Sequence, residues 1–154
     1  MKFRRLVLQE LREVESEFVK FLASQGVTSD LWIRMQSDPS VLEQQLDAFS
    51  DLFWESRLAG INYLMRDDGE RVWHFAFGDT NAVCFALKKP DETGIQSAES
   101  GVKTYAASDR SKELYDLLEQ GAQPVDGKAF TSLASRTKIE DPAANRASQT
   151  AVAD

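Results

Sequence analysis

Residues 61–87 read INYLMRDDGERVWHFAFGDTNAVCFAL and form the densest run of strand-forming apolar residues in the 154-residue chain. Two turn signals, DDG at 67–69 and DTN at 79–81, divide this run into three segments. Short apolar and aromatic segments separated by Gly, Asp and Asn are typical of antiparallel hairpins. The sequence therefore predicts a three-stranded antiparallel meander.

The lengths of the two turns determine which side chains share a face, because side chains alternate between the two faces of a strand. A two-residue turn at 68–69 would place Trp73 on the opposite face from Tyr63. A three-residue loop over 67–69, with its glycine in the left-handed region, pairs Tyr63 with Trp73 instead. We predict this loop and a matching one over 79–81, so that all the large rings of the meander face the same way.

The reverse face of this predicted sheet carries small residues and is the candidate partner surface. Its members are Val72, His74, Ala76, Ala82, Cys84 and Ala86. Either the helix predicted over 108–121 or a partner chain would cover it; the helix is favoured because its leucines need burial, and the alternative stays open. Trp32 and Trp54 are further candidates for contact, because tryptophans at helix margins serve as interface anchors as well as core edges; a place at the edge of the core is favoured for both.

Amphipathic helices precede the meander. Apolar residues recur at three- and four-residue spacing over 7–22, which predicts a first long helix. A short helix is expected over 30–35. A second long helix begins with Asp38 as its cap and Pro39 at its first position, and ends before Gly60. We expect the two long helices to pack on the aromatic face of the meander.

The pattern after residue 87 is weaker. Residues 88–107 show no sustained period and predict a flexible loop. Residues 108–121 carry a leucine stripe and predict a C-terminal helix, after which Asp126 would cap a short turn. Residues 137–154 are small and polar, and we expect them to be disordered. The predicted fold is α+β, a single domain over 1–136 in which two long N-terminal helices pack on a three-stranded antiparallel meander, followed by a C-terminal helix and a disordered tail.

Composition and charge exclude several classes of protein. The chain has 18 Lys and Arg against 25 Asp and Glu, a formal net charge of −7, which opposes binding to a phosphate backbone, so nucleic acid is not an expected partner. No window reaches the roughly 18 apolar residues of a membrane span, and residues 1–15 lack the apolar region of a signal peptide. The single cysteine, Cys84, cannot form an intrachain disulfide, which suits a cytoplasmic location.

Residues suited to catalysis are few. His74 is the only histidine, and a structural role on a half-buried sheet surface is favoured over a proton-transfer role, because the sequence places no nucleophile or orienting carboxylate beside it. The predicted register would make Cys84 only a diagonal neighbour of His74, so a Cys–His dyad is not favoured. We assign no catalytic residue, and the chain is more readily a binding protein than an enzyme.

No metal or cofactor site is predicted. The carboxylates of Glu10, Glu13 and Glu17 share one helix face but lack the Glu-x-x-His element of di-iron proteins, and a solvated face explains them. The acidic residues at 67–70 fit a turn and lack the alternating ligands of an EF-hand loop. Glycines occur singly, so no phosphate-binding loop is present.

Four segments together resemble a known family. They are MKFRRL at 1–6, FVKFLASQGV at 18–27, FSDLFWE at 49–55 and KELYDLLEQGAQPVDGKAF at 112–130. They resemble a family of small uncharacterised proteins from Bacteroidetes-type bacteria, known only as a domain of unknown function, over residues 1 to about 133. The chain has Val7 where a Ser or Thr cap would be expected. The resemblance implies no activity, cofactor or catalytic residue, and supports a cytoplasmic bacterial setting.

Two functions of different class remain. The first is a non-enzymatic protein-interaction or regulatory module that binds a protein partner or self-associates. The alternative is a small enzyme or ligand-binding protein that uses His74 with nearby carboxylates. The first is favoured because the sequence does not bring together a nucleophile, a base and an orienting group of the kind that catalysis needs.

Overall fold

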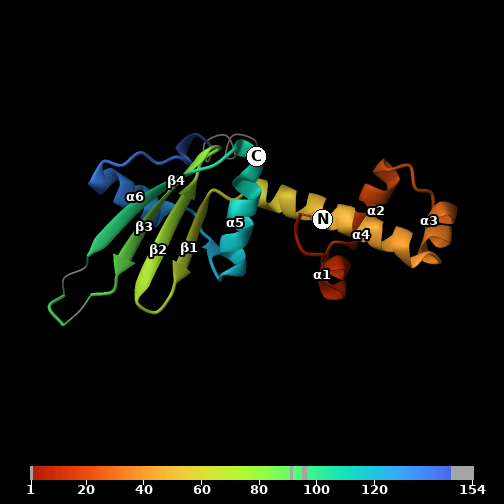
Figure 1. The fold of residues 1–154 in the computed structure, drawn as a ribbon, viewed down its shortest axis with the longest axis horizontal. Coiled ribbons are helices and arrows are strands. Elements are labelled where there is room, and N and C mark those ends of the chain that lie inside the picture. The colour runs from red at the N-terminus through yellow and green to blue at the C-terminus, as the bar shows by residue number, and fades with distance from the viewer. Residues whose placement is uncertain (1, 91, 95–96, 147–154) are drawn as a thin grey trace. The chain divides into compact units, whose positions relative to one another are not determined.

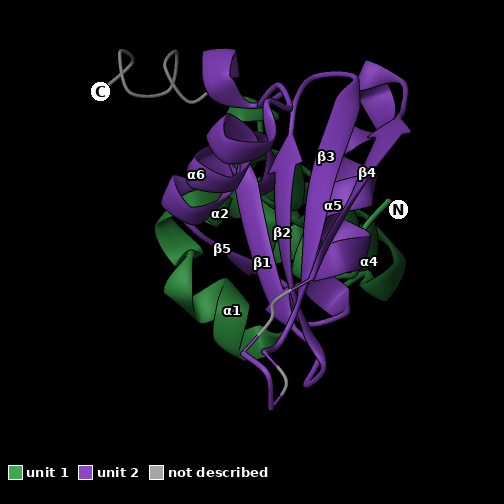
Figure 2. Ribbon diagram, turned by 90° about the vertical axis from the view of Figure 1, so that its left-hand side faces the viewer, with its two compact units in different colours: residues 1–57 green, residues 58–154 purple. Residues whose placement is uncertain are grey.

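The computed structural model describes residues 2–90, 92–94 and 97–146 of the chain (Figure 1). It divides into two compact units, residues 1–57 and 58–154 (Figure 2). Each unit has a hydrophobic core cluster of its own. The boundary falls near the end of the longest helix.

The first unit is helical. Its elements are α1 (Leu8–Glu13), α2 (Glu15–Ser24), α3 (Ser29–Gln36) and most of α4 (Pro39–Ala59). The predicted first long helix is divided at Val14, whose φ of −116° and ψ of 24° interrupt it. The second begins as predicted, because the Asp38 carboxylate accepts the backbone N–H of Ser40 at 3.1 Å and Pro39 is the first helical residue.

The core of the first unit is built from aliphatic and aromatic side chains of its helices and of the residues that flank them. Leu6, Val14 and Phe49 are buried in it, and Leu11, Phe18, Phe21, Phe53 and Trp54 pack around them. The ring centroids of Phe18 and Phe49 lie 5.0 Å apart. The apolar stripes found in the sequence thus bury against one another within the unit.

The second unit contains an antiparallel sheet of five strands in the order β4-β3-β2-β1-β5. The strands are β1 (Tyr63–Asp67), β2 (Arg71–Phe77), β3 (Asn81–Lys88), β4 (Ala98–Thr104) and β5 (Gln123–Pro124). The predicted fold, two long N-terminal helices on a three-stranded meander, is therefore wrong in its strand number and its layers. The meander forms, but β4 and β5 extend it on either side, and β4 arises from the predicted loop over 88–107.

The observed register also differs from the predicted one. Tyr63 pairs with Ala76, and Trp73 pairs with Ala86, so Trp73 and Phe85 lie on opposite faces of the sheet. Two-residue turns cause this difference. The first turn has Gly69 at its start with φ +96°, as a type II′ turn requires, and it closes where the backbone N–H of Asp68 donates to the carbonyl of Arg71.

Both faces of the sheet are covered from within the second unit. One face packs on α6 (Lys128–Thr137), where Phe130 and Phe85 have ring centroids 5.1 Å apart. The core on this side comprises Tyr63, Ala76, Val83, Phe85, Phe130, Leu133, Ala134 and Ala143. The other face carries α5 (Arg110–Glu119), which follows a 3₁₀ turn, η1 (Ala107–Asp109).

Part of the predicted disordered tail packs against the sheet. Ile139 and the fully buried Ala143 belong to the core on the α6 side. The hydroxyl of Tyr63 donates to Asp141 at 2.7 Å, and the Arg146 guanidinium donates to the carbonyl of Ala59 at 2.8 Å. Residues 147–154 lie outside the described part of the chain.

Candidate functional site

The residues of the predicted partner surface do not share a face. Val72, His74 and Ala76 belong to the face covered by α6, since their partners in β3 are Leu87, Phe85 and Val83. Ala82, Cys84 and Ala86 belong to the α5 face, opposite Phe77, Phe75 and Trp73. Two-residue turns invert the parity of alternate strands, so each face mixes large and small residues. The flat small-residue face is therefore absent.

His74 is a buried side chain of the α6 face. It is 8% exposed, pairs with Met65 and Phe85, and burial lowers the pKa of its imidazole. Cys84 lies on the opposite face, so the two side chains cannot form a dyad. Burial raises the pKa of the Cys84 thiol, which leaves it a neutral, weakly nucleophilic group.

The two tryptophans proposed as contact residues belong to the first unit. Trp32 meets the ring of Phe18 edge-on, with centroids 5.6 Å apart. The Trp54 indole donates to the carbonyl of Arg4 at 3.2 Å, and the Arg4 guanidinium lies 4.9 Å from its ring centroid. Both side chains have packing roles within that unit.

Two of the acidic groups set aside as metal ligands, Glu10 and Asp68, have partners within the protein. Glu10 accepts from both terminal nitrogens of Arg4 and from the backbone N–H of Val7, which lowers its pKa to about 2. Asp68 accepts from the Trp73 indole and from the backbone of the turn, which lowers its pKa to about 2. In the described part of the chain, no group of three His, Cys, Asp or Glu could hold a metal ion.

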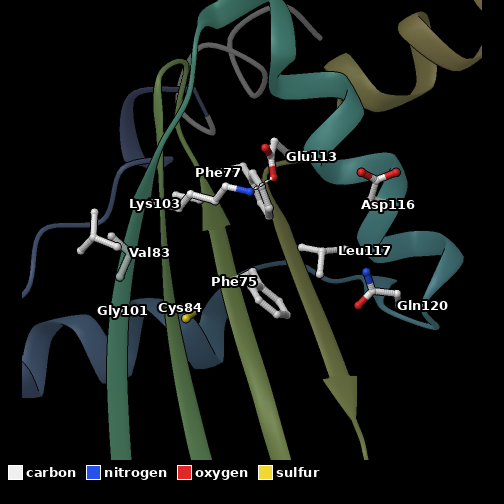
Figure 3. A pocket seen from close by; sticks show the side chains of 12 residues that line it. Phe75, Phe77, Val83, Cys84, Gly101, Lys103, Glu113, Asp116, Leu117 and Gln120 are labelled. Atoms are coloured by element: carbon white, nitrogen blue, oxygen red, sulfur yellow. Dashed lines mark hydrogen bonds and ion pairs between the residues drawn. The ribbon is translucent and has the colours of Figure 1, made fainter. Parts of the chain in front are cut away.

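A groove of about 390 Å³ lies between α5 and the sheet (Figure 3). We call it the α5 groove. Its floor consists of residues that share one face of three adjacent strands, namely Phe75 and Phe77 of β2, Ala82 and Cys84 of β3, and Gly101 and Lys103 of β4. Its wall is one face of α5, where Glu113, Asp116, Leu117 and Gln120 recur at three- and four-residue spacing.

The floor of the groove is open because of one glycine. Gly101 lies opposite Cys84 in the β3–β4 pairing, and a Cβ at this position would lie 3.5 Å from the Cys84 sulfur. With hydrogen in its place, the surface beside the sulfur stays uncovered. The floor continues toward the turn as a row of rings, in which Trp73 and Phe75 stack with centroids 6.3 Å apart.

Charged side chains form the rim of the groove. The Lys103 ammonium lies 2.6 Å from the Glu113 carboxylate and joins β4 to α5 (Figure 3). Lys112 pairs with Asp116 one turn along the same helix, at 2.8 Å. Exposed pairs of this kind add little stability, so their main effect here is a polar border around an apolar floor.

Buried Arg110 fixes the start of α5 over the sheet. Its guanidinium donates to the carbonyls of Gly78 at 3.0 Å, Leu58 at 3.2 Å, Ile61 at 2.6 Å and Phe77 at 3.1 Å. One side chain thereby joins the end of α4, the approach to β1 and the end of β2. Sequence reasoning missed Arg110, because nothing in the charged run at 109–113 distinguishes it from its neighbours.

Within residues 2–90, 92–94 and 97–146, no helix combines the length and hydropathy that a membrane-spanning segment needs.

Residues 1–100 match a protein family described as a family of unknown function (DUF6495). The match confirms the resemblance to a domain of unknown function, while an origin in Bacteroidetes-type bacteria stays a prediction. The chain matches no curated protein and no solved structure.

Proposed function

The chain belongs to the DUF6495 family of unknown function, and we propose that it acts as a non-enzymatic protein-interaction module whose binding surface is the α5 groove. The observation that carries this proposal is the pairing of an apolar floor with a charged rim on one side of the sheet. Protein interfaces have this anatomy: an apolar centre that excludes water and a polar border that sets orientation.

The groove suits apolar side chains presented by a segment of a partner protein. Phe75 and Leu117 are half-buried and face it from the sheet and the helix. Phe77 and Ala82 continue this apolar lining along the floor. Burying these surfaces would supply the binding free energy, since transfer of apolar area from water contributes about 25 cal/mol per Å².

The alternative, an enzyme or ligand-binding protein that uses His74 with nearby carboxylates, has less support. His74 faces α6, whereas the carboxylates of the groove, Glu113 and Asp116, lie on the other side of the sheet and pair with lysines. General acid–base catalysis needs such groups within hydrogen-bond reach of one substrate. Their placement on opposite sides favours the interaction module.

We also propose a bacterial cytoplasmic location, without nucleic acid as a partner. The single cysteine supports the cytoplasmic location, and the net charge of −7 opposes binding to nucleic acid. Cell fractionation with an antibody against the chain tests the location, and recovery in the envelope fraction would contradict it.

Photocrosslinking in the native cell tests the groove. A benzoylphenylalanine at Gln120, which lines the groove, should crosslink one protein, and the Leu117→Arg variant carrying the same probe should lose that product. The same probe at Lys128, an exposed position on α6, is the matched control and should not give it. Crosslinks to the same protein from both probe positions would contradict the groove as the binding surface.

The single cysteine gives a second measurement. Cys84 lies in the floor of the groove, so the purified crosslinked partner should slow alkylation of its thiol, and Leu117→Arg should abolish that protection. A small apolar molecule is the competing occupant. Native mass spectrometry that finds such a molecule bound to the chain isolated from its own cells, with no protein crosslinked at Gln120, would overturn the proposal.

A further inference from the structure

The sheet has one open edge that offers a long strand. β4 is the last strand in the order β4-β3-β2-β1-β5, so in the described part of the chain no strand pairs with its outer side. The opposite edge is β5, which has only two residues and contains Pro124. Natural sheets usually blunt an edge in that way, with a short strand or a proline. β4 spans seven residues and has no proline.

The outward backbone groups of β4 can be assigned from the pairing with β3. The N–H of Lys88 donates to the carbonyl of Ser97, and the N–H of Tyr105 donates to the carbonyl of Thr80, each at 2.9 Å. Hydrogen-bonded and non-hydrogen-bonded positions alternate in an antiparallel pair. The odd-numbered residues of β4 therefore bond to β3, and the even-numbered ones direct N–H and C=O to the open edge. These are Ala98, Ser100, Val102 and Thr104.

The charges of β4 are complementary to a second copy of β4. Glu99 and Lys103 lie on the α5 side of the sheet, two residues to either side of Gly101. When two copies pair antiparallel about Gly101, Glu99 of each faces Lys103 of the other. Pairing about Ser100 or Val102 would set one of the two charges opposite Gly101 and lose both ion pairs.

The same register satisfies the backbone. A two-fold pairing about Gly101 aligns all seven residues of β4 and sets even-numbered residues opposite even-numbered ones, so that their outward groups bond to each other. Glu99 and Lys103 then occupy non-hydrogen-bonded positions, where cross-strand side chains approach most closely. Lys103 can keep its bond to Glu113, because an ammonium has three donors.

We propose that β4 joins two copies of this chain into a symmetric dimer with one continuous ten-stranded sheet. A second copy of β4 is the partner that fits this edge, because its outward backbone groups match those of the first copy and its Glu99 and Lys103 meet charges of opposite sign. This interface runs along the outer edge of β4 and shares Gly101 and Lys103 with the α5 groove, but neither proposal requires the other.

Sedimentation equilibrium of the full chain at low salt tests the dimer. The wild type should sediment as a dimer, and Val102→Pro should be a monomer, because its lost N–H points away from β3 and the strand itself is kept. Val102→Thr is the matched control and should stay dimeric. A monomeric wild type at every concentration reached would overturn the proposal, and so would a dimer of unchanged affinity in Val102→Pro.

Reversing the charges of Glu99 and Lys103 tests the register. It also tests the dimer independently of Val102→Pro, in case that variant misfolds. Glu99→Lys and Lys103→Glu should each raise the dimer dissociation constant about tenfold, since each sets like charges opposite one another twice. Mixed in equal amounts, the two variants should form a heterodimer of wild-type affinity, because the lysine introduced in one chain then faces the glutamate introduced in the other, and the second ion pair keeps its native residues. A mixture no tighter than the separate variants would contradict pairing about Gly101.

Discussion

At the scale of single residues, Arg110 has the most consequential position in the second unit. It is 7% exposed, and its guanidinium is held by backbone carbonyls from three separate segments. Burial lowers the pKa of its guanidinium, and the hydrogen bonds to the carbonyls offset the cost of burying the charge. Arg110 therefore positions α5, and with it the wall of the groove.

Replacing Arg110 should destabilise the protein strongly. Arg110→Met removes four hydrogen bonds to backbone carbonyls in a buried site, so we expect the free energy of unfolding to fall by about 3 kcal/mol. Arg136→Met, an exposed position on α6, should change it by less than about 0.5 kcal/mol. Urea denaturation followed by circular dichroism measures both. Equal midpoints for the two variants would refute the positioning role.

Tyr63 should make stability depend on alkaline pH. Burial and the hydrogen bond to Asp141 raise its pKa from 10.0 to about 12. Because the folded pKa is raised, its contribution is complete below pH 10 and is lost as pH rises from 10 to 12. Tyr63→Phe should show a smaller loss of stability over that range, and Asp141→Asn should lower the pKa of Tyr63 in an ultraviolet titration. A wild-type stability that stays flat over the range would contradict this assignment.

At the scale of elements, the short turns of the meander are decisive. The Asp68 carboxylate accepts the backbone N–H of Glu70 at 3.0 Å and of Arg71 at 2.7 Å, as well as the Trp73 indole at 2.9 Å. These bonds hold a two-residue turn. The shorter turn moves the large rings of β2 to the side of α5, where they form the floor of the groove.

Gly69 should be needed for its backbone conformation alone. Its φ is +96°, and a Cβ added there would meet nothing within 4 Å. Gly69→Ala should therefore cost about 1 kcal/mol of stability through backbone strain. Glu70→Ala, in the same turn, should cost less than about 0.5 kcal/mol. Thermal denaturation of the pair distinguishes them, and an unchanged Gly69→Ala variant would argue against the turn.

At the scale of the whole molecule, the chain builds two cores, and the second is closed by residues far along the sequence. Ala143 is fully buried in the same cluster as Tyr63 and Phe130, although Tyr63 lies in the first strand of the sheet. Gly78 is close to this segment, since a Cβ there would lie 2.6 Å from the carbonyl oxygen of Pro142. The segment after α6 is thus an integral part of the second unit.

Charge placed in that segment should reveal its burial. Ala143→Arg should lower the free energy of unfolding by about 3 kcal/mol or more, because no room or partner exists for a guanidinium at a fully buried alanine. Asn145→Arg, two residues on and exposed, should have little effect. Hydrogen exchange of the β1 amides should be faster in Ala143→Arg and unchanged in Asn145→Arg, which would locate the destabilised region at β1. Equal effects of the two variants would place the segment outside the core.

The sequence alone determined the local features of this protein. The position of the meander, the start of α4 at Pro39 and the helix over 108–121 follow from periodicity, capping residues and turn residues, which act over a few neighbours. The resemblance to a domain of unknown function was also correct, since the family match covers residues 1–100, where three of the four resembling segments lie.

Only the tertiary structure decided the register, β4 and the groove. The residues of β4, AESGVKT, have no apolar run and become a strand through hydrogen bonds to β3. The length of the first turn decides which side chains share a face of the sheet. The sequence at 67–70 is compatible with both a two-residue and a three-residue turn, and the hydrogen bonds that the Asp68 side chain accepts select the shorter one. Arg110 and Cys84 acquire their roles from segments that the fold brings beside them, because pairing and burial depend on distance in space and are not encoded in local spacing.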